Sequence, residues 1–115
     1  MYDLTKIFKA LSDKNRLQIL KMLEIRPLCV CEITELLHLA TSTVSKHLSI
    51  LRDAGFIEDY KDGKWVYYKL IVSPSDYKIR QIMAFLPQWM EQYEEIQDLK
   101  SRTKVVDKDA ICSVK

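Results

Sequence analysis

The sequence has few glycines, few cysteines and no long apolar run, and each shortage excludes a class of protein. Only two glycines occur in 115 residues, without a low-complexity tract or internal repeat, which leaves a single globular domain as the expectation. Three cysteines are an odd and small number for a disulfide framework, so we expect a reducing, cytoplasmic compartment. No apolar stretch approaches the roughly 20 residues of a membrane-spanning helix, and no signal peptide is visible, so we expect no membrane partner.

The length and composition allow one domain with a modest core. Hydrophobic residues make up 48% of the chain and charged residues 30%, which is ordinary for a globular protein. We expect this domain over residues 1–100 and a flexible, basic tail over residues 101–115. The net charge of +2 does not by itself indicate a nucleic-acid-binding protein. Acidic side chains concentrate in residues 91–99, however, so a basic face can form elsewhere on the domain. No catalytic set of nucleophile, base and orienting acid is legible, so we expect no enzyme.

Residues 28–55 carry the spacing of a helix-turn-helix. A short apolar helix leads to a polar break at residues 40–43, and a second helix ends at Gly55, a residue suited to a helix C-cap. The second helix has an aliphatic inner face and an outer face of small hydrogen-bonding side chains, which suits a major groove. His47 lies at the edge of the inner face, where we favour a half-buried, hydrogen-bonded role over base contact. The outer residues that we expect to contact DNA are Thr41, Ser42, Ser45, Lys46 and Ser49.

A β-hairpin is predicted directly after this helix pair, which makes the expected fold a winged helix. Residues 56–61 and 64–70 are rich in strand-forming side chains, and Asp62-Gly63 between them fits a two-residue turn. Lys61 and Lys64 flank the turn, where they can reach phosphates or the minor groove. Surface lysines on a solvated hairpin are the alternative, but the preceding helix-turn-helix favours DNA contact.

Helices at both ends of the domain are predicted to join two copies of the chain. The final helix repeats apolar side chains every three or four residues from Ile79 to Ile96, close to a heptad, and Pro87 should kink it. A chain of this length has little core left to cover so long a stripe, so a homodimer is expected, with intramolecular packing of the stripe as the alternative. The expected interface comprises Leu4, Ile7, Phe8, Leu11, Ile82, Leu86, Trp89 and Tyr93.

The candidate metal ligands are two thiols, Cys29 and Cys31, at or near a predicted helix N-terminus. Exposed backbone N–H groups and the helix dipole there favour thiolate, the form that binds arsenic(III), antimony(III) or cadmium. Residues i and i+2 of a regular helix point about 200° apart, so one ion holds both sulfurs only if the first turn distorts. Two alternatives remain open: buried core cysteines, or a redox switch in which Cys112 acts as the resolving thiol.

Three segments together resemble the ArsR/SmtB family of metal-sensing repressors, and most closely its arsenic-responsive branch. These segments are residues 28–32 with their Cys-Val-Cys element, residues 45–48 and residues 62–68, and the resemblance extends over residues 4–100. The resemblance implies a mainly α winged helix-turn-helix with four helices, a two-stranded wing and a final helix. It also implies a homodimeric repressor that binds an inverted-repeat operator in double-stranded DNA and releases it on binding arsenic(III) or antimony(III). Cadmium or lead are possible inducers, and no organic cofactor is expected.

The chain departs from the family pattern at several positions. Thr34 stands where the arsenic-responsive branch often has a third cysteine, so Cys112 is the remaining candidate for a third ligand. The zinc site of the last helix cannot be built, because no histidine follows His47. Ala40 replaces a serine that commonly caps the recognition helix, so either Thr41 takes over the cap or the helix starts less firmly.

Two alternative functions stay open at this point. One is a thiol-redox-responsive winged-helix repressor, and the other is a winged-helix interaction domain that does not bind DNA. The sequence decides neither the inducing ion, nor the operator sequence and regulated genes, nor the participation of Cys112.

Overall fold

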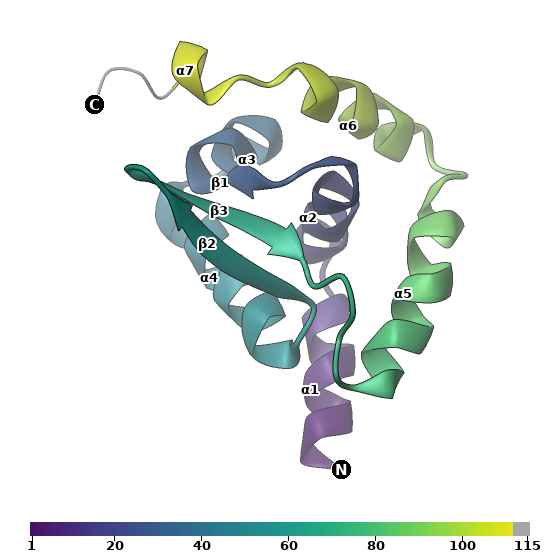
Figure 1. The fold of residues 1–115 in the computed structure, drawn as a ribbon. Coiled ribbons are helices and arrows are strands. Elements are labelled where there is room, and N and C mark those ends of the chain that lie inside the picture. The colour runs from purple at the N-terminus through teal and green to yellow at the C-terminus, as the bar shows by residue number, and fades with distance from the viewer. Residues whose placement is uncertain (112–115) are drawn as a thin grey trace.

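The computed structural model describes residues 1–111 and confirms a mainly helical fold with a β-hairpin wing (Figure 1). Residues 112–115, and with them the candidate ligand Cys112, lie outside the described part of the chain. The elements in chain order are α1 (Tyr2–Leu11), α2 (Lys14–Ile25), β1 (Leu28–Cys29), α3 (Val30–Leu37), α4 (Thr41–Ala54), β2 (Ile57–Asp62), β3 (Trp65–Leu70), α5 (Tyr77–Met90), α6 (Glu94–Val105) and α7 (Lys108–Ile111).

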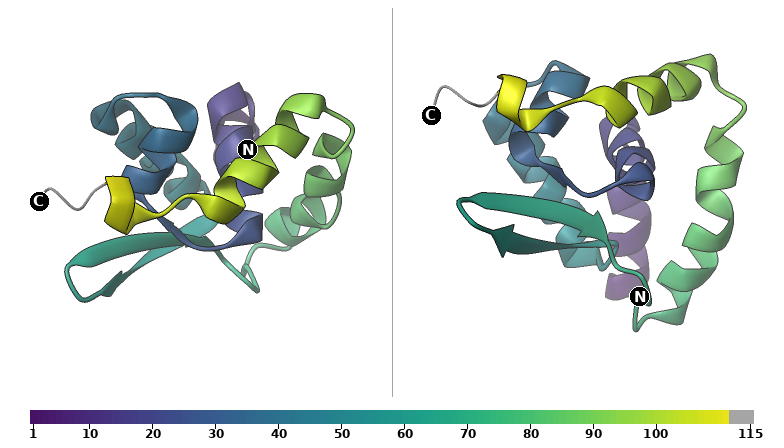
Figure 2. Two further views of the ribbon diagram at one scale, coloured as in Figure 1. Left: turned by 90° about the horizontal axis from the view of Figure 1, so that it is seen from above. Right: turned by 45° about the horizontal axis from the view of Figure 1, so that its top comes forward.

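The C-terminal third differs from the sequence prediction. The expected final helix is two helices, α5 and α6, separated at residues 91–93, and Pro87 lies within α5. Helix α6 continues to Val105. The predicted boundary between the domain and its tail, at residues 100 and 101, therefore falls inside a helix. Figure 2 shows α6 returning across the domain from the end of α5, and α7 contacts α3.

Helices α3 and α4 form the predicted helix-turn-helix. His38 ends α3 in the left-handed region at φ 57°, and Gly55 ends α4 at φ 97°, a conformation in which glycine is unstrained. Ala40 is the N-cap of α4 and supplies no side-chain bond, so α4 starts without the cap that Thr41 was a candidate to provide. The predicted inner face of α4 is confirmed, because its aliphatic side chains Val44, Leu48 and Leu51 are buried.

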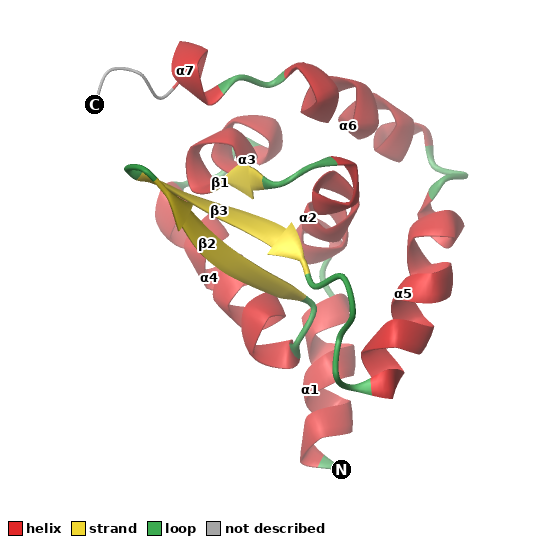
Figure 3. Ribbon diagram, viewed as in Figure 1, coloured by secondary structure: helices red, strands yellow, loops and turns green. Residues whose placement is uncertain are grey.

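The wing is part of a three-stranded antiparallel sheet in the order β1-β3-β2 (Figure 3). Asp62 pairs with Trp65, so the two turn residues are Gly63 and Lys64, one position later than the predicted Asp62-Gly63. Gly63 has φ 64° and Lys64 does not have a positive φ, which matches a type II′ turn with glycine at its first central position. The short strand β1, absent from the prediction, pairs Cys29 with Tyr67 and so joins the start of α3 to the wing.

A buried lysine fixes the junction of α5 and α6 to the central helix α2. Lys21 is 1% exposed, and its Nζ donates to the Pro87 carbonyl at 3.1 Å and forms ion pairs with Glu24 and Glu91. Burial alone would lower the pKa of Lys21, but the two carboxylates outweigh it and raise the pKa. Lys100 also bonds Glu91 at 2.8 Å, so one carboxylate holds α2 and α6 at the point where the chain reverses.

Glu91→Gln is expected to make unfolding less dependent on acid. Hydrogen bonds from Lys100, Lys21 and Gln97 lower the pKa of Glu91 from 4.5 to about 2. Because the folded pKa is depressed, the carboxylate stabilises the protein fully above pH 4.5, and this stabilisation is lost as the pH falls through about 2. Urea unfolding of both proteins between pH 7 and pH 2 should show a midpoint difference that shrinks with acid.

The exposed carboxylate Glu35 provides the matched control, because Glu35→Gln removes a surface charge from α3. Its unfolding midpoint should follow the wild-type protein at each pH. A difference for Glu91→Gln that stays constant from pH 7 to pH 2 would contradict the assignment.

Candidate nucleic-acid interface and thiol site

The structure leaves the predicted DNA-contacting side chains accessible. Helix α4 presents its polar face outward, and Ser49 alone of that set is half-buried. Lys64 lies in the wing turn with its Nζ 5.5 Å from the centre of the Trp65 ring. The exposed members are Thr41, Ser42, Ser45, Lys46, Lys61 and Lys64.

Arg16, which the sequence did not single out, connects α4 to the N-terminal helices. Its Nε and Nη2 donate to the carbonyls of Ala10 and Lys9 at the end of α1, at 2.8 and 3.1 Å. Its Nη1 lies 3.0 Å from His47 Nδ1 in α4. Because a guanidinium only donates, His47 Nδ1 accepts and the ring proton belongs on Nε2. His47 therefore has the half-buried, hydrogen-bonded role that the sequence favoured.

Cys29 ends β1 and occupies the N-cap position of α3. Its backbone N–H donates to Glu32 Oε1 at 3.0 Å, and its thiol lies 3.4 Å from the same oxygen and donates to it. The backbone N–H of Glu32 faces the Cys29 sulfur in return, which completes a capping box with a thiol in the place of the usual hydroxyl. Cys29 is 2% exposed and Glu32 is 3% exposed, so the start of α3 depends on a buried polar pair.

The expected thiolate character of Cys29 is wrong. Burial raises the pKa of the Cys29 thiol, and the Glu32 carboxylate adds to that rise. The helix N-terminus does act in the predicted direction, because backbone N–H groups of Glu32 and Cys31 lower the pKa, but they do not compensate for the loss of solvent. Cys29 is therefore a protonated thiol near neutral pH in this conformation.

One cavity joins both cysteines to the elements expected to contact DNA. It has a volume of about 430 Å³ and lies between the start of α3, the start of α4 and the wing. Thr34, at the position of the missing third cysteine, donates from its hydroxyl to the Cys31 carbonyl at 2.7 Å. The lining residues are Cys29, Val30, Cys31, Thr34, Thr41, Trp65 and Val66.

Within residues 1–111, no three His, Cys, Asp or Glu side chains cluster closely enough to hold a metal ion. Sulfur is the preferred donor for a soft ion, and the two cysteines line one cavity. The spacing of the cysteines predicts that an ion held by both sulfurs requires rearrangement of the first turn of α3.

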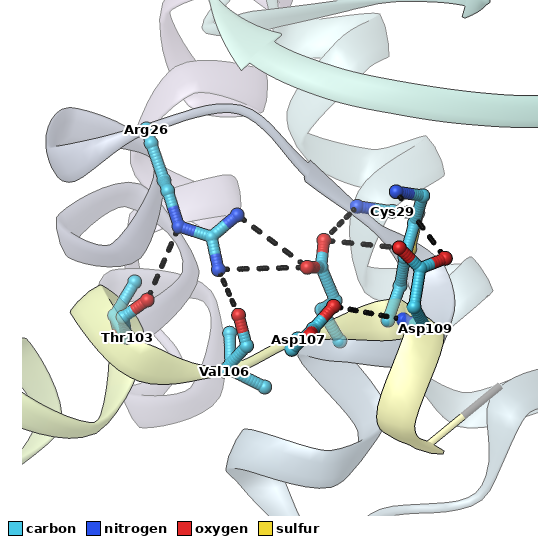
Figure 4. Close-up of polar contacts among 8 residues, drawn as sticks. Arg26, Cys29, Thr103, Val106, Asp107 and Asp109 are labelled. Atoms are coloured by element: carbon cyan, nitrogen blue, oxygen red, sulfur yellow. Dashed lines mark hydrogen bonds and ion pairs between the residues drawn. The ribbon is translucent and has the colours of Figure 1, made fainter.

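Arg26, also missed from the sequence, ties the Cys29–Glu32 pair to the C-terminal helices (Figure 4). Its guanidinium lies 3.4 Å from Glu32 Oε2, and it donates to the backbone carbonyls of Thr103, at 3.3 Å, and Val106. Figure 4 shows Arg26, just after α2, pointing toward Thr103 in α6 and Val106 directly after it. Arg26 directly precedes Pro27 and is the C-cap of α2.

Comparison with known proteins places this geometry in a family. The family model described as "Bacterial regulatory protein, arsR family" matches residues 13–59, from α2 into β2. A cadmium resistance transcriptional regulatory protein CadC homolog from Staphylococcus aureus is 39% identical over 89 residues, which are 75% of this chain and 70% of that protein. The arsenical resistance operon repressor of Escherichia coli is 42% identical over 66 residues, 56% of each chain, so the match spans about half of that repressor.

Solved structures agree with the sequence relatives. Reduced HlyU from Vibrio cholerae N16961 has a TM-score of 0.65 and 29% identity over 81% of this chain and 90% of that chain. HlyU from Vibrio vulnificus CMCP6 has a TM-score of 0.62 and 32% identity, covering 78% and 86% of the two chains. The chain belongs to the ArsR family. Members of the ArsR family are transcriptional regulators rather than enzymes, and no helix in the described part of this chain is long and apolar enough to cross a membrane.

The candidate dimer face of this ArsR-family chain carries exposed aromatic side chains on α1 and α5. Phe8 is 59% exposed and Trp89 is 62% exposed, and Phe85, which the sequence prediction omitted, stacks on Trp89 with 6.4 Å between ring centres. Ile7 is a correction, because it is 2% exposed and belongs to the core of the subunit itself. Tyr93 is exposed, and the remaining predicted interface residues, Leu4, Leu11, Ile82 and Leu86, are half-buried.

Cys29 is expected to react slowly with iodoacetamide at pH 8 in the folded, reduced protein. Burial and the raised pKa both reduce the amount of accessible thiolate, so alkylation should be at least roughly tenfold slower than in urea, where the same thiol is solvated. Peptide mass spectrometry follows the modification of Cys29 over time. Equal rates in the folded and unfolded protein would mean that the thiol is neither buried nor protonated as described.

Proposed function

We propose that this chain is a homodimeric transcriptional repressor that binds inverted-repeat operator DNA and releases it when a soft ion binds Cys29 and Cys31. Arsenic(III) or antimony(III) is the proposed inducer, with cadmium or lead as further possibilities. The observation that carries this proposal is the cavity that joins Cys29 and Cys31 to Thr41 of α4 and Trp65 of the wing. An ion that rearranges this cavity acts directly on both elements expected to contact DNA.

The proposed DNA contacts divide between α4 and the wing. The exposed hydroxyls of Ser42 and Ser45 are placed to bond base edges or phosphates, and Lys46 to neutralise a phosphate. Lys61 and Lys64 on the wing add charge beside the groove that α4 occupies. A dimer would place two α4 helices in successive major grooves, about one helical turn of DNA apart. The names of the CadC and arsenical resistance relatives support the regulatory role.

Ion binding and DNA binding would require different conformations of the first turn of α3. Cys29 is the N-cap of α3 and Cys31 is in its first turn, so bringing both sulfurs to one ion disturbs the capping box with Glu32. Each As–S bond replaces an As–OH bond of arsenous acid, and the thiol proton leaves with the hydroxide as water. This exchange releases no net proton, so the raised pKa of Cys29 does not make the affinity for arsenous acid depend on pH while the thiol is protonated. Cadmium or lead would displace the thiol proton into solution, so the affinity for these ions should increase as the pH rises.

Serine replacements at the cysteines test the proposed inducer site. Cys29→Ser and Cys31→Ser should each retain operator binding but lose the response to arsenite, because a serine hydroxyl stays protonated and is a poor ligand for a soft ion. Fluorescence anisotropy of labelled operator DNA, in reducing buffer, should be measured with arsenite, antimonite, cadmium, lead and zinc. Cys112→Ser should weaken the response if Cys112 is a third ligand, and leave it unchanged if it is not.

Full arsenite response in both Cys29→Ser and Cys31→Ser would refute the thiol sensor. A response that requires an oxidant and no metal ion would favour the redox alternative. Failure of the reduced, ion-free protein to bind any operator fragment would favour the interaction domain.

Lysine replacements test the proposed docking face. Lys46→Ala or Lys64→Ala should weaken operator binding and reduce the slope of log affinity against log salt by about 0.9 for each phosphate that is no longer neutralised. Lys14→Ala is the matched control, since it removes an exposed lysine at the start of α2 that is ion-paired with Glu95 on α6. The docking face would be wrongly assigned if the slopes of both test variants equalled those of the wild-type protein and the control.

A charge placed on the aromatic face tests the homodimer. Trp89→Glu should shift the protein from dimer to monomer in analytical ultracentrifugation at micromolar concentration, because dimerisation would bury an unpaired carboxylate. Val105→Glu, at an exposed position on α6, should leave the dimer intact. A wild-type monomer at this concentration, or a Trp89→Glu dimer of unchanged affinity, would contradict the proposed interface.

A further inference from the structure

The segment after the middle of α6 crosses the helix-turn-helix and has no part in the function proposed so far. We call residues 102–111, which comprise the last turn of α6, the following link and α7, the C-terminal strap. Figure 1 and Figure 2 show it lying over α3, and both α6 and α7 contact that helix. Helix α3 contains Cys31 and is capped by Cys29, so the strap covers the element on which ion binding would act.

The strap is bonded to the C-terminal end of α3. Arg102 Nη1 donates to the Leu36 carbonyl at 2.9 Å. The last carbonyls of a helix have no partner within it, so this bond fills an acceptor that α3 leaves open. Arg102 Nε is held at the same time by Asp98 one turn earlier in α6, at 2.9 Å, which fixes the direction of the guanidinium.

The strap is also bonded to the N-terminal end of α3, through two intermediate side chains. Arg26 donates to the strap carbonyls of Thr103 and Val106 and to Glu32 Oε2. The second oxygen of Glu32, Oε1, accepts from the backbone N–H and the thiol of Cys29. A continuous set of hydrogen bonds therefore runs from the Cys29 sulfur, through a carboxylate that is 3% exposed, to the strap backbone.

A third attachment connects the strap to the wing. Lys108 Nζ lies 5.6 Å from the centre of the Trp65 ring and 5.7 Å from that of Tyr67, both on β3. Ammonium groups at this distance from aromatic rings are attracted to them. The strap thus contacts both ends of α3 and the wing, and Trp65 also lines the cavity of the two cysteines.

We propose that the C-terminal strap is a clamp that holds α3 and the wing in the DNA-binding arrangement, and that an ion bound to Cys29 loosens it through Glu32 and Arg26. This inference rests on the proposed function and specifies how its site is regulated. When arsenic replaces the thiol proton, the Cys29 sulfur no longer donates to Glu32, and its movement toward the ion draws the cap away. A buried carboxylate that loses donors must rearrange or regain water. Arg26 is shared between Glu32 and the strap, so it moves with the carboxylate.

Glu32 and Arg26 act in this scheme as positioning residues, since the ion contacts neither of them. Their role predicts a change in the strap itself, separate from any change in DNA affinity. Loss of one charge-assisted hydrogen bond between Cys29, Glu32, Arg26 and the strap should speed local opening of the strap roughly tenfold.

Hydrogen–deuterium exchange of the full-length protein in reducing buffer tests the clamp. Arsenite should accelerate exchange in peptides covering residues 102–111 in the wild-type protein and have no such effect in Cys29→Ser. Without any ion, Glu32→Gln should accelerate exchange of the strap, because it removes the charge that holds Arg26. Glu58→Gln is the matched control, since it breaks the exposed ion pair with Lys69 on the wing and touches neither α3 nor the strap.

Arg26→Lys provides a second variant if Glu32→Gln does not fold, because it keeps the charge but cannot bridge Glu32 and two carbonyls at once. Operator affinity measured on the same samples separates the clamp from the proposed function. Arsenite that lowers operator affinity without changing strap exchange would overturn the clamp and leave the proposed function standing. Strap exchange that stays at the wild-type rate in both Glu32→Gln and Arg26→Lys would overturn it as well. If arsenite neither binds the protein nor causes it to release DNA, the proposed function is refuted, and with it the release of the clamp by an ion.

Discussion

The buried carboxylate of Glu32 is the group on which the arrangement around the thiols depends. It caps the start of α3 through Cys29 and pairs with Arg26, and Arg26 in turn holds the backbone that follows α6. A carboxylate at 3% exposure is stable only while its donors remain in place, so the geometry of Cys29, Arg26 and the strap is interdependent. Chemistry at the Cys29 sulfur therefore has a direct structural consequence, without any long pathway between distant sites.

Two further cations set the positions of the helices around this centre. Arg16 joins the end of α1 to His47 on α4, and Lys21 joins α2 to the reversal between α5 and α6. Arg16 donates to the Ala10 and Lys9 carbonyls at the end of α1, and Lys21 donates to the Pro87 carbonyl near the end of α5. The last carbonyls of a helix have no partner within that helix. The proposed DNA-contacting helix and the proposed dimer helix are thus each attached to the central helices by a cation as well as by apolar packing.

The parts of the fold that the sequence predicted are those set by local rules. The helix-turn-helix and the wing follow from apolar periodicity and from strand and turn residues that act over a few positions. The turn lies at Gly63-Lys64, one residue later than predicted, because its position is set by the pairing register of the two strands. Lys21 bonds the Pro87 carbonyl and Glu91 beside the division of the final helix at residues 91–93, a tertiary interaction that periodicity does not contain. For the same reason Lys21, which lies on the more polar side of its helix by sequence, is buried.

The structure bears on the chemical state of the candidate site. Cys29 and Cys31 line one cavity, as a shared role requires, yet Cys29 is protonated because burial outweighs the helix N-terminus. Arg26 could not be assigned beforehand, since its partner Val106 lies 80 residues away in the chain. Glu32 lies only three residues after Cys29, but the capping box that it completes has a thiol in the place of the usual hydroxyl. The central claim is that ion binding undoes the cap of α3, and NMR carbon shifts of residues 29–33 in the reduced protein test it most directly. On adding arsenite, the account predicts that residues 30–33 lose their helical shifts and that the Cys29 amide loses its hydrogen bond to Glu32. Release of operator DNA by arsenite while these shifts stay helical would contradict it.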